Sequence, residues 1–111
     1  MKHVTFADKS LLMDDETADA LVRYAAVLAS HGQADDVEVN AYGSDGDSVM
    51  ATMLLSQGAS LMAETASSDL PGPDNSSLLA YIEEHLSRLE SPARPMEDED
   101  PNLSQLQDYD F

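Results

Sequence analysis

The strongest constraint on the fold is a pair of alternating segments, residues 37–42 and 49–55, separated by a short polar linker. In both segments an apolar residue stands at every second position, which places one face of an extended strand against a core. The linker, residues 43–47, combines glycine with serine and aspartate, the residue types that form tight turns. We therefore predict an antiparallel hairpin whose apolar face is covered by another layer.

Three further segments extend the predicted sheet. Residues 2–6 alternate and include β-branched and aromatic side chains, which indicates a strand. Residues 9–13 either lengthen that strand or form a separate one, and residues 61–65 form another after the break at Gln57-Gly58. Together with the hairpin, these segments predict a sheet of four or five mainly antiparallel strands.

Two other segments have the periodicity of amphipathic helices. The first begins after an N-cap at Asp14 or Asp15, runs to about Ser30 and stops at Gly32. Its apolar face is predicted at Ala18, Leu21, Val22, Ala25 and Leu28. The second helix is expected from about Ser76 to Glu90, after a loop at residues 67–75. Its buried stripe is predicted at Leu79, Ile82, Leu86 and Leu89. The result is an α+β fold with two helices packed on the sheet.

The length of the chain and a shift in composition near Pro92 define its organisation. A chain of 111 residues builds one domain with one core. Beyond Pro92, acidic residues and prolines leave too little apolar content to fold. We predict an acidic α+β domain at residues 1–91 and a flexible acidic tail at residues 92–111. The apolar residues within 102–111 suit either a segment that orders on a partner or a solvated tail.

The charge of the chain is strongly one-sided. Twenty-two acidic residues against five basic ones give a net charge of −17. Residues 91–111 hold only six of the acids, so most of the excess belongs to the folded part. Such a surface serves solubility or attracts a cationic partner by long-range steering. We expect no direct binding to nucleic acid, because phosphate contacts require many lysines and arginines.

No motif in the sequence indicates catalysis. The absence of cysteine removes disulfides, thiol catalysis and cysteine-based zinc sites. His3, His31 and His85 lack the spacing of a metal site, and residues 44–47 lack the ligand ladder of a calcium loop. Phosphate-binding and hydrolase motifs are missing as well. We expect no enzyme, cofactor or metal, although clustered carboxylates leave a small enzyme as a third alternative.

Nothing in the sequence indicates a membrane segment. No stretch approaches the 18 or so apolar residues that a spanning helix needs, and the first residues lack a signal-peptide pattern. We therefore expect a cytoplasmic protein.

Three segments resemble the phage uracil-DNA glycosylase inhibitors, which are also acidic and free of cysteine. Ser10-Leu11-Leu12-Met13 and the acidic helix after it resemble the family's edge strand and its following helix. Val39-Asn40-Ala41-Tyr42 with its turn resembles the central hairpin, and Met53-Leu54-Leu55-Ser56 with Ala59 resembles the end of that hairpin. The likeness covers about residues 4–65. Lys9 stands where the family has an acid, and the extra helix follows the last strand instead of preceding the first.

The resemblance implies a DNA mimic. Its carboxylates would occupy phosphate-like positions in the cationic groove of the target, and a pocket between helix and sheet would hold the apolar finger that extrudes the base. The implied phosphate mimics are Asp8, Ser10, Glu16 and Asp19. The implied pocket residues are Met13, Leu21, Val22, Val39, Met53 and Met62, which equally suit an ordinary helix-on-sheet core.

The sequence therefore predicts an inhibitor of a DNA-processing enzyme, with uracil-DNA glycosylase as the favoured partner. The alternative is an acidic adaptor or immunity-type interaction domain whose partner is unknown, bound through its acidic face or its tail.

Overall fold

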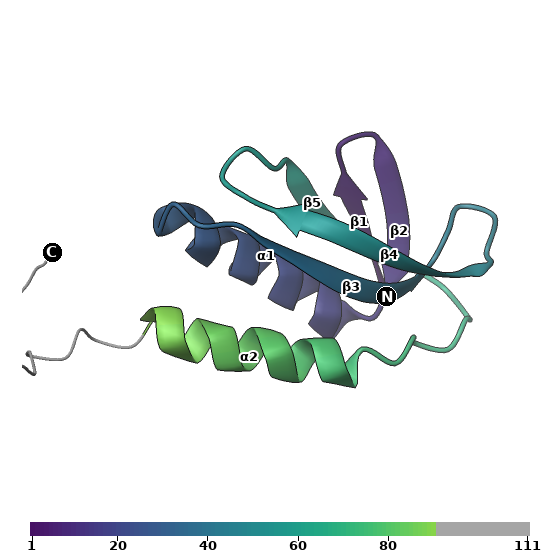
Figure 1. Cartoon of the computed structure of the whole chain (residues 1–111). Coiled ribbons are helices and arrows are strands. Elements are labelled where there is room, and N and C mark those ends of the chain that lie inside the picture. Colours follow the sequence, from purple (N-terminus) through teal and green to yellow (C-terminus); the bar gives the residue numbers. More distant parts are fainter. Residues whose placement is uncertain (91–111) are drawn as a thin grey trace, which may run out of the picture.

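The predicted hairpin is formed by β3 (Asp35–Tyr42) and β4 (Ser48–Leu55) in the computed structural model, which describes residues 1–90 (Figure 1). Val37 lies opposite Met53 and Val39 opposite Ala51, so the apolar positions of the two strands share one face. Gly46 closes the turn with a φ of 87°, which a residue with a Cβ adopts only under strain. The alternation of the sequence is thus confirmed as a two-stranded ribbon with one buried face.

Three further strands complete an antiparallel sheet: β1 (Lys2–Phe6), β2 (Lys9–Met13) and β5 (Leu61–Thr65). Their order is β4-β3-β2-β1-β5, and every neighbouring pair is antiparallel. The expected α+β class is confirmed, with five strands. Residues 9–13 form a separate strand because the chain reverses at Ala7, which has a left-handed φ of 57°.

The position of β2 differs from the edge position that the resemblance implied. β2 pairs with β1 along its whole length and with β3 at Leu12 and Tyr42, so it lies in the middle of the sheet. The free edges belong to β4 and β5 instead. The backbone of Ser10–Met13 is therefore paired with β1 along its length, and Leu12 has a second partner on β3.

The first helix, α1 (Asp15–Ser30), packs across one face of the sheet. Asp14 is its N-cap and accepts hydrogen bonds from the backbone and the hydroxyl of Thr17. Gly32 follows its end with a φ of 64°, as predicted for a C-terminal stop. Its buried residues are Thr17, Ala18, Leu21, Tyr24 and Leu28. Tyr24 therefore takes the place in the core that the sequence analysis assigned to Val22.

The second helix, α2 (Ser76–Glu90), lies beside α1 and against β3 (Figure 1). Its bounds agree with the prediction. Leu78, Ile82 and Leu86 are buried, whereas Leu79 and Leu89 are half-buried. The buried stripe is thus rotated slightly from the predicted one because α2 faces α1 as well as the sheet. The predicted tail, residues 92–111, lies outside the residues that the structure describes, and so does residue 91, the predicted end of the domain.

Asn75, at the start of α2, hydrogen-bonds to the backbone of β3 in the way that a residue of a neighbouring strand would. Its side-chain oxygen accepts from the backbone nitrogen of Asn40 at 2.8 Å, and its nitrogen donates to the backbone oxygen of Asn40 at 2.8 Å. The same nitrogen donates to Asp14 at 3.1 Å. Asn75 is buried, so these bonds connect the loop before α2 to the centre of the fold.

Replacing Asn75 with alanine should lower the free energy of unfolding by roughly 2–4 kcal/mol, because three hydrogen bonds at a buried site are lost together. Urea denaturation followed by circular dichroism measures this change. The matched control is Asn40→Ala, which keeps the backbone partners of Asn75 and removes one side-chain bond, to the backbone oxygen of Asp74. Equal losses for the two variants would show that Asn75 contributes no more than an ordinary surface contact.

Candidate protein-binding groove

A groove of about 310 Å³ lies between α1 and α2. Its rim carries three carboxylates, from Glu16 and Asp19 on α1 and Glu83 on α2. Its floor and walls are apolar and come from Ala20, Leu79, Ile82 and Leu86. The groove forms because two helices each present residues at spacings of three and four toward a common seam. It is suited to a ligand with an aliphatic body and a cationic end.

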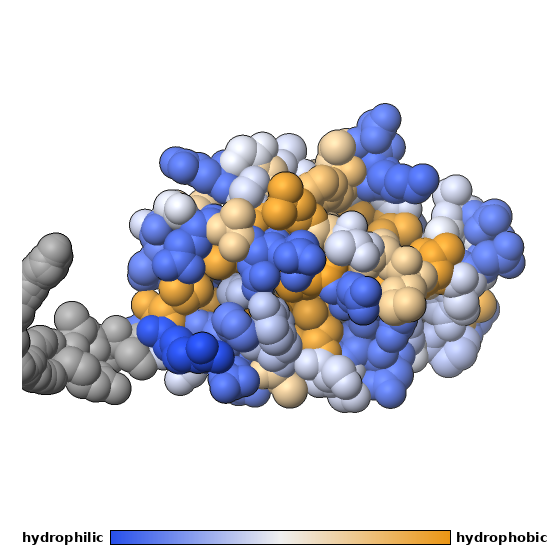
Figure 2. Space-filling view, in the orientation of Figure 1, coloured by the Kyte–Doolittle hydropathy of each residue, from blue (hydrophilic) through white to orange (hydrophobic). Residues whose placement is uncertain are grey.

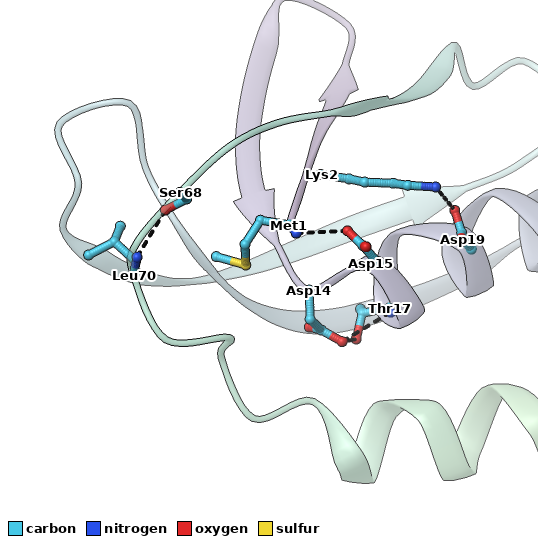
Figure 3. A network of polar contacts seen from close by, with 8 residues as sticks. All are labelled: Met1, Lys2, Asp14, Asp15, Thr17, Asp19, Ser68 and Leu70. Atoms are coloured by element: carbon cyan, nitrogen blue, oxygen red, sulfur yellow. Dashed lines mark hydrogen bonds and ion pairs between the residues drawn. The ribbon is translucent and has the colours of Figure 1, made fainter.

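Ion pairs within the domain distinguish the carboxylates of this region. The Lys2 ammonium lies 2.7 Å from the Asp19 carboxylate, and the N-terminal ammonium of Met1 lies 2.8 Å from Asp15 (Figure 3). The hydrogen bond to Asp19 raises the pKa of Lys2 above its ordinary value. Asp19 is thus already neutralised in part, whereas Glu16 and Glu83 form no ion pair with residues 1–90. These two carboxylates are the ones most available to a partner.

Arg23 lines the groove from α1 and pairs with Glu90 at the end of α2, with a nitrogen–oxygen distance of 2.7 Å. The side chain contributes a positive charge to the groove wall. Because Glu90 neutralises it, the charge offered to a visiting cation remains that of the carboxylates.

The other two implied phosphate mimics lie elsewhere. Asp8 is in the turn between β1 and β2, and Ser10 follows on β2; both are exposed and border a hollow beside Gly43 and Ser44. Six residues of extended chain separate Asp8 from Asp14, which is roughly 20 Å. The structure therefore brings Glu16 and Asp19 together on α1. Asp8 and Ser10 lie at the turn of the β1–β2 hairpin, which is the end away from α1.

The seam between α1 and the sheet is a closed core. Met13, Leu21, Val39 and Met53 are all buried in one hydrophobic cluster together with Tyr24. Val22 and Met62 point away from this cluster, with 37% and 54% of their surfaces exposed. The six implied pocket residues thus divide into four core residues and two surface residues. The seam between α1 and the sheet is therefore filled, whereas α1 and α2 leave an open groove between them.

A cluster of polar aromatic residues, which the sequence analysis did not single out, joins the middle of both helices to the start of β3. The hydroxyl groups of Tyr24 and Tyr81 both donate to one oxygen of Asp35, with Tyr81 at 2.6 Å. The ring of His85 lies 3.9 Å from that of Tyr81. Burial acts to raise the pKa of Asp35, but the two hydroxyl donors outweigh it and the pKa lies below its usual value. Asp35 is therefore ionised at neutral pH, and the cluster locks α2 in place.

Within residues 1–90, no group of three His, Asp or Glu side chains is arranged to hold a metal ion. Neither α1 nor α2 is long and apolar enough to cross a membrane. Comparison with protein-family models, with curated proteins and with solved structures finds no significant match to this chain.

Proposed function

We propose that this domain binds the cationic, DNA-binding surface of a partner protein and acts there as a DNA mimic, with uracil-DNA glycosylase as the favoured target. The observation that supports the proposal is the groove between α1 and α2, in which Glu16, Asp19 and Glu83 flank an apolar floor. The net charge of −17 adds a long-range field that speeds encounter with a cationic surface. We place this activity in the cytoplasm and propose no catalytic role for the domain.

The groove suggests how a partner would be held. The aliphatic stem of a lysine or arginine would lie along Ile82 and Leu86, and its charged end would reach Glu16 and Glu83. Charge-assisted hydrogen bonds to carboxylates are roughly twice as strong as neutral ones, so each captured side chain adds both affinity and orientation. In this proposal an apolar finger of the partner would also enter here, because the helix–sheet seam is filled.

The experiment that tests the proposal measures uracil excision by a purified uracil-DNA glycosylase in the presence of this protein. We expect inhibition that weakens as salt rises, since screening reduces attraction between exposed charges. Displacement of labelled duplex DNA from the glycosylase should follow the same salt dependence. Full excision at a large excess of this protein would remove the glycosylase as the target.

The central position of β2 favours a second candidate, an acidic adaptor or immunity-type domain. One of the three segments that carry the resemblance to glycosylase inhibitors is an edge strand at Ser10–Met13, and this strand has neighbours on both sides. Such a domain would use the same groove on a cationic surface that does not bind DNA. A partner that binds this protein and duplex DNA at the same time would support the adaptor and contradict the mimic.

A further inference from the structure

The exposed edge of the sheet at β4 differs in chemistry from the rest of the surface. Residues 48–63 form the longest run of the sequence without an Asp, Glu, Lys, Arg or His residue. β4 has a strand neighbour on one side only among the described residues. Met50 and Leu54 project from its outer face with 67% and 57% of their surfaces exposed, and Figure 2 shows hydrophobic residues at the surface over β4.

The backbone of β4 presents N–H and C=O groups along its free edge, where another strand could pair with them. Asn40 directs its own N–H and C=O toward Asn75, away from β4, so Asn40 and Met50 are a pair without mutual hydrogen bonds. Met50 therefore turns its N–H and C=O to the free edge. The antiparallel pattern alternates, so Thr52 and Leu54 do the same. Natural edge strands of this length are usually protected by charges, prolines or bulges, and β4 contains no charge and no proline.

We propose that β4 pairs with β4 of a second copy of this chain, in an antiparallel arrangement centred on Thr52. This alignment places Thr52 opposite the partner's Thr52 and Met50 opposite the partner's Leu54. Each exposed apolar side chain then meets an apolar neighbour on the same face, and all the paired residues direct their backbone groups at one another. The two sheets become one sheet of ten strands.

β4 is self-complementary in this alignment. Its lack of charge favours a second copy of this chain as the strand that pairs with it. Two molecules with a net charge of −17 repel each other through most of their surfaces. Asp47 precedes the start of β4, and the acids that face the middle of the strand stand one strand inward, with Glu38 opposite Thr52 on β3. With strands about 4.8 Å apart, the two Glu38 positions would be separated by about 14 Å. That distance exceeds the Debye length of about 8 Å at physiological salt.

The opposite edge of the sheet does not offer the same surface. β5 has five residues and carries Glu64, so two copies paired there would bring like charges close together. This difference between the edges supplies a matched control, because Met62 on β5 and Thr52 on β4 are both exposed residues on the outer face.

Single cysteines test the arrangement directly, because the chain contains no natural cysteine. Paired residues that exchange backbone hydrogen bonds have Cα atoms about 5.5 Å apart, within the range of about 4.4–6.8 Å that a disulfide spans. Under mild oxidation, Thr52→Cys should give a covalent dimer, whereas Met62→Cys should remain monomeric. Cross-linking of Met62→Cys at an equal rate would overturn the proposal.

Sedimentation of the full chain over a series of concentrations supplies the second measurement. The dimer fraction should rise with concentration and increase from about 0.1 M to about 1 M salt, as the Debye length falls from about 10 Å to about 3 Å. Thr52→Lys should abolish the dimer although it makes the net charge less negative. The lysine faces Glu38 of its own chain, so the monomer keeps its fold.

Two results would contradict the inference. One is a wild-type chain that stays monomeric at every concentration and salt. The other is a Thr52→Cys variant that cross-links to a different protein but not to itself, which would assign the edge to a foreign strand. This inference is independent of the proposed function, because cationic partners should bind more weakly as salt rises and the dimer should not.

Discussion

Replacement of Tyr24 with alanine should lower the free energy of unfolding by about 3–5 kcal/mol, as found for aromatic residues removed from cores. Tyr24 is one of the largest fully buried side chains and packs edge-on against Tyr81 and His85. Its loss leaves a cavity between α1 and α2 and removes one donor to Asp35. Small domains have a free energy of unfolding of about 5–15 kcal/mol, so the midpoint temperature of thermal unfolding should fall markedly. Denaturant titration of the purified variant measures the change.

Removal of the hydroxyl donors alone separates the hydrogen bonds from the cavity. In the double variant Tyr24→Phe and Tyr81→Phe, the rings remain and Asp35 loses two donors. Because the folded pKa of Asp35 is lowered, its contribution is complete above the unfolded pKa of about 3.9 and is lost as pH falls through the folded value. The stability difference between wild type and double variant should therefore be largest near neutral pH and shrink below about pH 4. A difference that does not change with pH would contradict this role of Asp35.

Local features of the fold could be predicted because each depends on a few neighbouring residues. The hairpin follows from alternation around a glycine-containing turn, and α1 from the acidic cap at Asp14 and the stop at Gly32. The choice between Val22 and Tyr24 could not be made in this way. Both stand close to the apolar stripe, and only the presence of α2 and Asp35 gives a buried tyrosine hydroxyl its partner.

The order of strands and the site depend on contacts between distant segments. β2 follows β1 directly, but its second neighbour is β3, which comes after a whole helix. Asn75 lies in a polar loop whose composition indicates only a turn, yet it binds the backbone of Asn40. The groove likewise joins residues of α1 with residues of α2 about sixty positions later. Patterns of single segments cannot show whether such a seam is open or filled, because side-chain volumes on both sides decide it.

Reversal of two charges at the groove should abolish binding to a cationic partner. Glu16 and Glu83 line the groove from opposite helices and form no ion pair with residues 1–90. The double variant Glu16→Lys with Glu83→Lys therefore changes the groove without breaking an ion pair among those residues. Close charge pairs across an interface contribute about 1.5–7 kcal/mol. We expect a loss of at least about 3 kcal/mol, which is more than a hundredfold in Kd. Isothermal titration against the partner, or glycosylase inhibition if that target holds, measures it.

The matched control changes the net charge equally at exposed positions outside the groove. Glu64 on β5 and Asp69 in the following loop are exposed and do not line the groove. The variant Glu64→Lys with Asp69→Lys weakens the long-range field by the same amount, so it should slow association modestly and leave dissociation almost unchanged. Equal losses for both variants would mean that net charge alone drives the association. A selective loss for the first variant locates the contact between α1 and α2, because there the two altered carboxylates stand beside an apolar floor that would hold the stem of a bound side chain.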